Sequence, residues 1–243
     1  MSPEPALVLN VNKLVKRFGG FHALDGLSFQ VRPGEILGLV GPNGSGKTTA
    51  INVISGLYAP DGGDITLFAE PIGGSASHRI VSRGINRTFQ VPKPFTSLTV
   101  RQNVQVALQY GRDPAGEPGL EALLTEFRLA DLADRPASEL NSVQQKLLDL
   151  VRALATRPRL LLLDELAAGL NPTELDWIAG RIKALAASGT TIIVVEHLMG
   201  FIEHVTDRVI VLNAGKEIFE GRLADALREP QVIEVFLGAE HAG

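Results

Sequence analysis

The segment from Gly41 to Thr49 constrains the fold more than any other part of the chain. It reads Gly-Pro-Asn-Gly-Ser-Gly-Lys-Thr-Thr and matches the phosphate-binding loop pattern G-x-x-x-x-G-K-[ST] at every fixed position. Residues 35–40 before it predict a short buried strand, and residues 49–57 after it predict a helix. Because the motif works between a strand and a helix, this context predicts an α/β domain that binds a nucleotide.

Each part of the loop has a chemical reason to bind a triphosphate. Its glycines allow the backbone to turn N–H groups towards phosphate oxygens, and the following helix adds the positive end of its dipole. Lys47 is expected to contact the outer phosphates, and the Thr48 hydroxyl is expected to ligate Mg²⁺. The alternative is a glycine turn that binds nothing. The predicted nucleotide-binding residues are Gly41, Pro42, Asn43, Gly44, Ser45, Gly46, Lys47, Thr48 and Thr49.

Length and composition exclude several other kinds of protein. The chain has 243 residues, 45% of them hydrophobic, which is enough for one large domain with a packed core. A net charge of -4 gives no general attraction to nucleic acid, and the absence of cysteine excludes disulfides and thiolate metal sites. The N-terminus does not resemble a signal peptide, and no apolar run is as long as a membrane span. We therefore expect any work at a membrane to depend on docking to other subunits.

Apolar patterning predicts strands on both sides of a helical insertion. Two continuous apolar runs, residues 160–163 and 190–195, are typical of parallel strands buried on both faces. Further strands are predicted at residues 7–18, 24–31, 65–68, 208–212 and 217–220. Helices are predicted at residues 78–83, 100–110, 120–132, 142–155, 173–187 and 223–237, with a loop at 111–119. Ser142 and Gln145 have the spacing of a capping box.

Two acids at the end of a buried strand are candidates for metal binding and catalysis. Asp164 and Glu165 follow directly after the apolar run at 160–163. In a P-loop ATPase, the first acid holds Mg²⁺ through a water, and the second orients or deprotonates the attacking water. The alternative is a helix N-cap or a solvated acid. The phosphate-binding loop favours the functional interpretation.

Three further side chains are candidates for contacting the nucleotide. His197 follows the run at 190–195, and parallel strands of one sheet end on the same side, so it can reach a γ-phosphate. Gln90 is a candidate for contacting Mg²⁺ or the attacking water, with an exposed loop glutamine as the alternative. Phe18 is a candidate for stacking on adenine, with an ordinary core phenylalanine as the alternative.

These motifs together resemble the ATP-binding subunits of ABC transporters, and the resemblance covers nearly the whole chain. It identifies Gly41–Thr49 as the Walker A loop, Thr88-Phe89-Gln90 as the Q-loop and the strand ending at Asp164 as Walker B. It implies ATP and Mg²⁺ as ligands, with Thr48, Gln90 and Asp164 at the metal.

The resemblance also assigns the catalytic groups and the other motifs. Glu165 matches the catalytic glutamate, His197 the switch histidine, and Gly169-Leu170-Asn171-Pro172 the D-loop. Phe18 falls where the family places its adenine-stacking aromatic. Several stretches look closest to bacterial branched-chain amino acid importers, although urea, lipopolysaccharide and related systems share parts of them. These stretches are Lys16–Gly20, Arg87–Gln90, Ala167–Pro172 and Val235–Gly238.

The chain departs from the family pattern at two places. The signature, usually Leu-Ser-Gly-Gly-Gln, falls on Leu140-Asn141-Ser142-Val143-Gln144, so Ser142 and Val143 replace two glycines. Ser142 and Gln144 are expected to contact ATP held by the opposite subunit, but β-branched Val143 should crowd the backbone's approach to the γ-phosphate. Leu166 replaces a proline and could loosen the placement of Glu165. We therefore predict that the composite site completed by this signature binds or hydrolyses ATP weakly.

The resemblance implies one nucleotide-binding domain over residues 1–243. Its RecA-like P-loop NTPase core would span about 1–89 and 157–243, with an N-terminal antiparallel β region and a helical subdomain at about 90–156. The implied function is ATP hydrolysis that energises import of branched-chain or related amino acids. The implied partners are membrane permease subunits, a second ATPase subunit and, indirectly, a solute-binding protein. The implied location is the cytoplasmic face of the bacterial cell membrane.

Two rival functions stay open at this stage. One is a soluble ABC-type ATPase acting on DNA or ribosomes, although such proteins usually carry long coiled coils or tandem ATPase domains, which this sequence lacks. The other is a regulatory subunit that binds nucleotide with little hydrolysis, which the altered signature suggests. The residues leave open the transported solute, the choice between homodimer and heterodimer, and the role of the C-terminal segment.

Overall fold

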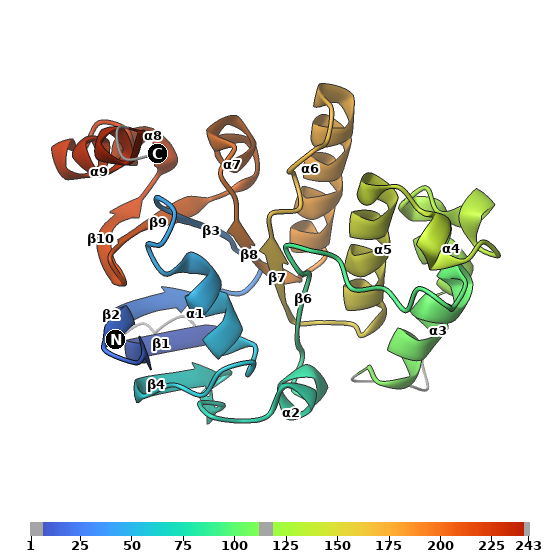
Figure 1. The fold of residues 1–243 in the computed structure, drawn as a ribbon, viewed down its shortest axis with the longest axis horizontal. Helices are drawn as coiled ribbons and strands as arrows, with labels where there is room; N and C mark the ends of the chain where they lie inside the picture. Colours follow the sequence, from blue (N-terminus) through green and yellow to red (C-terminus); the bar gives the residue numbers. More distant parts are fainter. Residues whose placement is uncertain (1–6, 112–118, 241–243) are drawn as a thin grey trace.

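The chain folds into two β-sheets and a separate group of helices (Figure 1). The structure, a computed structural model, describes residues 7–111 and 119–240, with side chains as far as residue 236. The smaller sheet is antiparallel, with strand order β2-β1-β4-β5. Its strands are β1 (Leu9–Phe18), β2 (Phe21–Val31), β4 (Gly62–Leu67) and β5 (Glu70–Pro71). The predicted antiparallel β region is confirmed. β5 was not predicted, and its two residues are too short to give a pattern.

The larger sheet has six strands in the order β10-β9-β3-β8-β7-β6. Strands β6, β7, β8, β3 and β9 pair in parallel, and β10 closes one edge as a hairpin with β9. Their bounds are β3 (Ile36–Val40), β6 (Ile85–Arg87), β7 (Leu160–Asp164), β8 (Thr191–Val195), β9 (Arg208–Asn213) and β10 (Lys216–Gly221). Every residue of β3, β7 and β8 is buried, as their continuous apolar runs predict.

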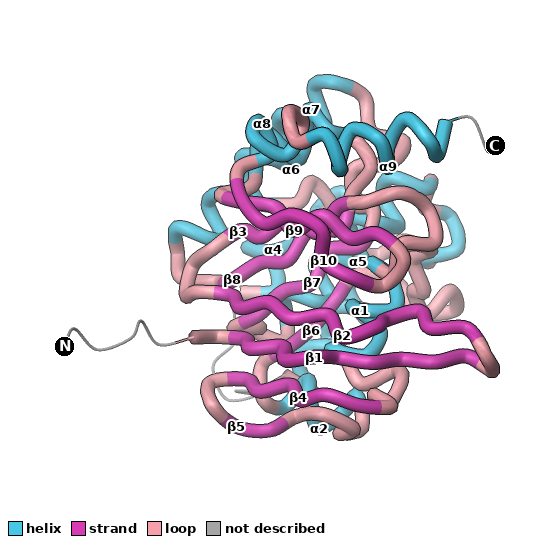
Figure 2. Tube along the Cα trace, turned by 90° about the vertical axis from the view of Figure 1, so that its left-hand side faces the viewer, coloured by secondary structure: helices cyan, strands magenta, loops and turns pink. Residues whose placement is uncertain are grey.

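Helix α1 (Lys47–Ile54) packs between the two sheets. Its residues Ala50, Ile51 and Ile54 belong to one hydrophobic cluster with Leu9 of β1 and Leu37 of β3. The helix that follows the phosphate-binding loop is therefore held by both sheets. Figure 2 shows α7 (Met199–Val205), α8 (Leu223–Ala226) and α9 (Pro230–Glu240) at the opposite end of the molecule from β4 and β5.

The helices α3 (Val100–Gln109), α4 (Leu120–Glu126) and α5 (Ser142–Ala155) gather beyond β6 and β7, beside α6 (Pro172–Ala187) (Figure 1). A second hydrophobic cluster joins α3, α4, α5 and α6 to the adjacent face of the six-stranded sheet. Helix α2 (Ser77–Ser82) lies near β6 and α7 follows β8. No helix in the described ranges is long and apolar enough to cross a membrane.

The structure corrects three local predictions. The predicted helix at 120–132 ends at Glu126, and Arg128 takes a left-handed φ of 58° before a short 3₁₀ turn at Ala130–Leu132. The predicted helix at 223–237 is split into α8 and α9, because the proline at 230 has no backbone N–H to continue a helix. Most of the predicted loop at 111–119 lies outside the described residues.

The third correction concerns the start of α5. The helix begins at Ser142 as predicted, but its N-cap is Asn141, whose side chain accepts a hydrogen bond from the Gln144 N–H. The Gln144 side chain accepts in return from the Asn141 N–H. Gln145, predicted to close the box, instead donates to the Leu140 carbonyl. The box lies one residue earlier because asparagine also caps well.

Candidate functional site

The candidate functional residues follow the ends of three parallel strands. Leu39 of β3 and Asp164 of β7 both pair in register with Val195 of β8. The three strands therefore end at one edge of the sheet, and the chain continues from them into the phosphate-binding loop, Glu165 and His197. This is the place where open α/β sheets bind their ligands.

Glycine is required at two points of the phosphate-binding loop. Gly41 and Gly46 have φ angles of 145° and 108°, which side chains rarely tolerate. A Cβ atom would lie 2.2 Å from the Leu212 carbonyl oxygen at Gly41 and 2.6 Å from the Ala23 carbonyl oxygen at Gly46. Gly46 also forms the N-cap of α1 without any side-chain hydrogen bond. The N-terminal amides of α1 thus stay available to an anion.

Lys47 folds its ammonium group over the same loop. Its Nζ donates to the carbonyl oxygens of Gly41 and Pro42, both at 2.8 Å. Burial lowers the pKa of Lys47, and the nearby carboxylates of Glu165 and Asp164 oppose that shift. The buried Lys47 side chain is thus held against the loop by its carbonyl oxygens, on the cavity that Thr48 and Glu165 also line.

Glu165 is held by two polar side chains. One carboxylate oxygen accepts a hydrogen bond of 2.8 Å from Gln90, and the other lies 2.7 Å from His197 Nε2. Burial raises the pKa of Glu165, but the hydrogen bonds and charge of these neighbours outweigh burial and bring the net pKa below its usual value. The carboxylate is therefore ionised and fixed in orientation, as a group that orients or deprotonates water must be.

Asp164 is buried beside Arg87, whose guanidinium lies 3.3 Å from one carboxylate oxygen. Burial raises the pKa of Asp164, while Arg87 and Lys47 oppose the shift. The other oxygen, Oδ1, has no hydrogen-bond partner among the described residues. An unpaired buried carboxylate oxygen is costly unless a water or cation joins it, so this donor fits a water-linked Mg²⁺.

A magnesium ion bound beside Asp164 would need ligands from the nucleotide as well as from the protein. In the described residues there is no group of three or more His, Cys, Asp or Glu side chains arranged to hold a metal. Mg²⁺ is commonly held by one or two protein oxygens together with substrate phosphates and water. The Thr48 hydroxyl and the Asp164 carboxylate match that donor set, and Gln90 lies on the same cavity as Thr48.

One cavity of about 300 Å³ brings most of the candidate residues together. Phe18 and Phe21 border it from the antiparallel sheet, and Phe18 packs edge-on against Tyr58 at a ring distance of 5.3 Å. Phe18 is 43% exposed and Phe21 is 62% exposed, so neither is a core residue. The cavity is lined by Phe18, Phe21, Ala23, Asn43, Gly44, Gly46, Lys47, Thr48, Thr49, Gln90, Glu165 and His197.

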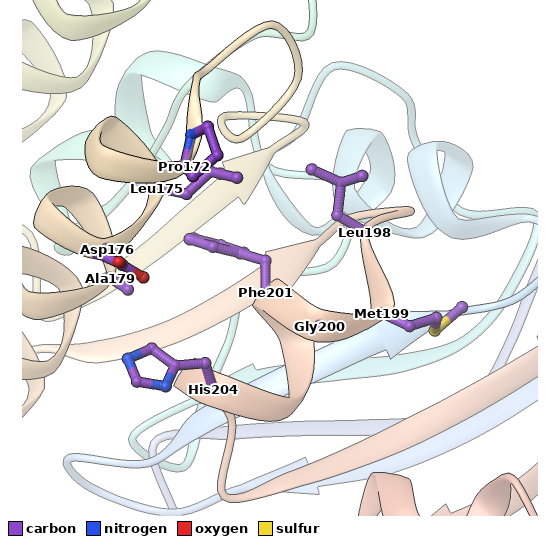
Figure 3. A pocket seen from close by; sticks show the side chains of 9 residues that line it. All are labelled: Pro172, Leu175, Asp176, Ala179, Leu198, Met199, Gly200, Phe201 and His204. Atoms are coloured by element: carbon purple, nitrogen blue, oxygen red, sulfur yellow. The ribbon is translucent and has the colours of Figure 1, made fainter.

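A second cavity, of about 350 Å³, lies between α6 and α7 (Figure 3). Leu175, Leu198 and Phe201 give it an apolar lining, and Figure 3 shows Phe201 pointing towards α6. Asp176 and His204 are the ionisable side chains among its lining residues. Although it is the larger cavity, it has neither the glycine loop nor a lysine, so its chemistry does not suit a triphosphate.

The signature residues lie apart from the 300 Å³ cavity, which we call the nucleotide cavity because Lys47 and the phosphate-binding loop line it. Asn141, Val143 and Gln144 border a separate cavity of about 220 Å³ beside Trp177 of α6. Val143 is half-buried and packs against the hydrophobic cluster of the helical region. Ser142 occupies the first helical position of α5. Neither Ser142 nor Gln144 lines the 300 Å³ cavity of its own chain.

Sequence reasoning missed several residues that shape the site. Phe21 is directly opposite Phe18 in the β1–β2 register, and this partner could have been found from the Gly-Gly turn between the strands. Arg87, Lys146 and Glu196 contact Asp164 or the turn after Glu165 from distant segments, so no local sequence pattern predicts these contacts. Such contacts depend on how α5, β6 and β8 pack together.

Comparison with known families and proteins agrees with this geometry. Residues 24–168 match the family described as ABC transporter. The high-affinity branched-chain amino acid transport ATP-binding protein BraF of Pseudomonas aeruginosa is 35% identical, covering 95% of this chain and 98% of that protein. The corresponding protein LivG of Escherichia coli is 36% identical, with the same coverage of both chains.

Solved structures give the same result for the fold. The crystal structure of a nucleotide-free ATP-binding cassette from an ABC transporter aligns with a TM-score of 0.86 and 32% identity, covering 95% of this chain and 98% of that one. The ADP conformation of MJ1267, an ATP-binding cassette of an ABC transporter, aligns with a TM-score of 0.84 and 34% identity, covering 96% and 99%.

Proposed function

Because the chain belongs to the ABC transporter family of ATP-binding proteins, we propose that it hydrolyses ATP to energise import of branched-chain or related amino acids. The observation that carries the proposal is the 300 Å³ cavity, where Lys47 and the loop face Glu165 and His197. The names of the relatives support the choice of solute class, since BraF and LivG serve branched-chain amino acid transport.

Within this proposal, the loop and the aromatic residues bind the nucleotide. The amides of the loop and the ammonium of Lys47 contact the phosphates, and Phe18 stacks on the adenine ring. Tyr58 packs edge-on against Phe18 and fixes the plane of its ring. Phe21 lies beside Phe18 and shields the base from water. The binding groups therefore come from both sheets.

The metal ligands in this proposal are Thr48, Asp164 and Gln90. Bound Mg²⁺ would neutralise charge on the phosphates, as in other phosphoryl-transfer sites. Thr48 supplies a hydroxyl oxygen and Asp164 supplies its unpaired Oδ1. Arg87 holds the opposite oxygen of Asp164, which orients the carboxylate. Gln90 serves both the metal and Glu165.

Glu165 acts on the attacking water. Its carboxylate accepts a proton from that water, and its lowered pKa keeps it ionised and ready to do so at neutral pH. His197 contacts the γ-phosphate with its ring and holds Glu165 in place. The same hydrogen bond therefore links the group that senses the phosphate to the group that activates water.

The remaining parts of the proposal concern assembly. Because Ser142 and Gln144 do not line the cavity of their own chain, we assign them to the nucleotide of a second ATPase subunit. Permease subunits, served by a solute-binding protein, would dock near the Q-loop and the helical subdomain at about 90–156, with the core at about 1–89 and 157–243. The chain would then work at the cytoplasmic face of the bacterial cell membrane.

Nucleotide binding and turnover by the full chain and its complex test the proposal. Binding of a fluorescent ATP analogue with Mg²⁺ is expected for the parent chain and for Glu165→Gln, but not for Lys47→Met. In the complex with its permease subunits, Glu165→Gln should lower the ATP turnover by about 10²- to 10⁴-fold, the usual contribution of a general base. The proposal fails if the parent chain does not bind MgATP.

The half-buried valine in the signature favours a second candidate function, a subunit that binds nucleotide but hydrolyses it little. Val143 keeps a branched side chain at the second helical position of α5, where the family has glycine. Turnover in the complex distinguishes the two functions. If Glu165→Gln in this chain leaves the turnover of the complex unchanged while MgATP still binds, the regulatory function is correct.

A further inference from the structure

The turn that follows Glu165 lacks the rigidity that a proline would give it. Glu165 itself has a left-handed φ of 51°, and Leu166 stands where the family usually has proline. Non-glycine residues keep a left-handed conformation only when their surroundings hold it. Something other than the local sequence must therefore fix residues 165–168, because they carry the carboxylate that faces the nucleotide cavity.

Lys146 holds this turn from the side of α5. Its Nζ donates to the carbonyl oxygens of Glu165 at 2.8 Å and Ala168 at 2.6 Å, at the two ends of the turn. Burial lowers the pKa of Lys146, while Glu196 and Glu165 oppose the shift. A single ammonium group thus spans the turn and ties it to the helix that begins with the signature.

Glu196 holds the same turn from the end of β8. Its Oε1 accepts a hydrogen bond of 2.6 Å from the Ala167 N–H, between the two carbonyls that Lys146 binds. Glu196 is only 2% exposed, although it immediately precedes the exposed His197. A buried carboxylate is costly unless it is hydrogen-bonded. Its burial here is explained by the bond to the turn.

We propose that Lys146 and Glu196 form a clamp that positions Glu165 and ties its placement to the signature helix and to His197. The inference rests on the proposed ATPase function. The clamp (Lys146 and Glu196) grips only backbone atoms of residues 165–168, which leaves the Glu165 side chain free to contact Gln90 and His197. Both members are positioning residues, since neither lines the nucleotide cavity.

The clamp restricts the turn at residues 165–168, which Leu166 does not do. Proline would restrict the turn through its own ring, whereas here two hydrogen bonds from Lys146 of α5 and one to Glu196, directly after β8, restrict it from outside. A displacement of α5 would therefore move the Glu165 backbone directly. A misplacement of about 1 Å can cost about a hundredfold in rate, so loss of the clamp should reduce turnover more than it reduces nucleotide binding.

Lys146→Met tests the first half of the clamp. In the complex with its permease subunits, kcat is expected to fall about tenfold to a hundredfold, while KM for ATP and nucleotide affinity of the full chain stay within about threefold. Lys146→Arg should recover most of kcat, because a guanidinium can donate to both carbonyls. Lys183→Met on the exposed face of α6 is the matched control and should leave kcat unchanged.

Glu196→Ala tests the second half through hydrogen exchange, which needs no turnover. Removing an acceptor that carries charge should speed exchange of the Ala167 amide in the full chain by about tenfold or more. Glu196→Gln keeps an acceptor and should protect the amide, and exposed Glu203→Ala is the matched control. The clamp is refuted if Glu196→Ala leaves this exchange unchanged, or if Lys146→Met lowers nucleotide affinity as much as kcat. If the parent binds no MgATP, the proposed function fails instead, and exchange alone decides whether the clamp holds the turn.

Discussion

At the scale of single residues, two adjacent carboxylates of the site have opposite environments. Asp164 lies in the sheet interior, where burial raises its pKa, and one of its oxygens has no partner among the described residues. Glu165 lies at the cavity, where hydrogen bonds from Gln90 and His197 bring its net pKa below the usual value. The roles proposed for the two acids rest on geometry: Asp164 has an unpaired oxygen that a metal-bound water can join, and Glu165 is held in orientation by Gln90 and His197.

Val143→Gly should raise the turnover of the composite site and lower the stability of the chain. Glycine removes the branched side chain from the start of α5, which allows a closer approach of the backbone to the γ-phosphate. The lower helix propensity of glycine should also reduce the free energy of unfolding by about 0.3–0.5 kcal/mol, in addition to the loss of the packing that half-buried Val143 contributes. Turnover of the assembled transporter and urea unfolding of the full chain measure the two effects. Val143→Ala keeps a Cβ, so its turnover should lie between those of the parent and Val143→Gly. Unchanged turnover in Val143→Gly would contradict the steric argument.

Asp149 of α5 should make the chain less stable as the pH rises above the usual range of an aspartate. Burial raises its pKa, against the hydrogen bond from the Phe89 N–H and the charge of Arg152. The folded state therefore binds this proton more tightly than the unfolded state does. The resulting loss of stability begins near the unfolded pKa of about 3.9 and is complete above the raised folded pKa.

The variant Asp149→Asn removes this contribution and tests its sign. Relative to the parent, the variant should gain free energy of unfolding as the pH rises from about 4 to about 7. Urea unfolding at several pH values measures the difference. Asp131→Asn, at an exposed position, is the matched control and should show no such gain. A variant that loses stability with rising pH would reverse the argument.

At the scale of elements, local sequence signals predict most of the helix and strand boundaries. The remaining boundaries depend on how the elements pack. The all-apolar runs of β7 and β8 predicted buried parallel strands, which the structure confirms. Capping boxes begin α3, α5 and α6, and each combines a Thr or Asn with a Gln or Glu three residues on. The break between α8 and α9 falls at Pro230, a local signal that ends or begins a helix.

Asn103 of α3 joins the helical region to the segment that follows the Q-loop. Its Oδ1 accepts a 2.8 Å hydrogen bond from the Phe95 N–H, and its Nδ2 donates to the carbonyl oxygens of Phe95 and Thr99, both at 3.0 Å. The side chain is fully buried. Asn103→Ala should lower the free energy of unfolding by about 2–3 kcal/mol, because it leaves buried backbone groups without partners. Urea unfolding measures this loss, and exposed Gln105→Ala on the same helix should cost far less.

At the scale of the whole molecule, one rule predicted that the loop, Glu165 and His197 lie close together: the carboxyl ends of parallel strands lie on the same side of a sheet. The six-stranded order places β3 beside β8 and β8 beside β7, so the three strand ends are neighbours. The rule could not find Arg87, which reaches Asp164 from β6, or Lys146, which reaches the turn from α5. Those contacts depend on side-chain lengths and helix placement, which no periodicity in the sequence encodes.

The nucleotide cavity joins the two sheets, so MgATP should stabilise the molecule as a whole. Phe18 and Phe21 come from the antiparallel sheet, whereas Glu165 and His197 follow strands of the six-stranded sheet. MgATP at about one hundred times its Kd should raise the free energy of unfolding by about 2.7 kcal/mol. For a chain of this size that corresponds to an increase in Tm of about 5–10 °C.

Thermal unfolding of the parent, Lys47→Met and Phe18→Ala separates the contributions of the phosphates and the base to this stabilisation. Lys47→Met should lose the increase in Tm, because the loop no longer holds the phosphates. Phe18→Ala should keep part of it at the same MgATP concentration, since stacking on a base contributes about 1–3 kcal/mol. Inorganic triphosphate with Mg²⁺ should stabilise the parent and Phe18→Ala equally, because it offers no ring to the aromatic side chain. If Phe18→Ala responds to MgATP as fully as the parent does, Phe18 does not bind the base, and the antiparallel sheet contributes to the cavity only as a wall.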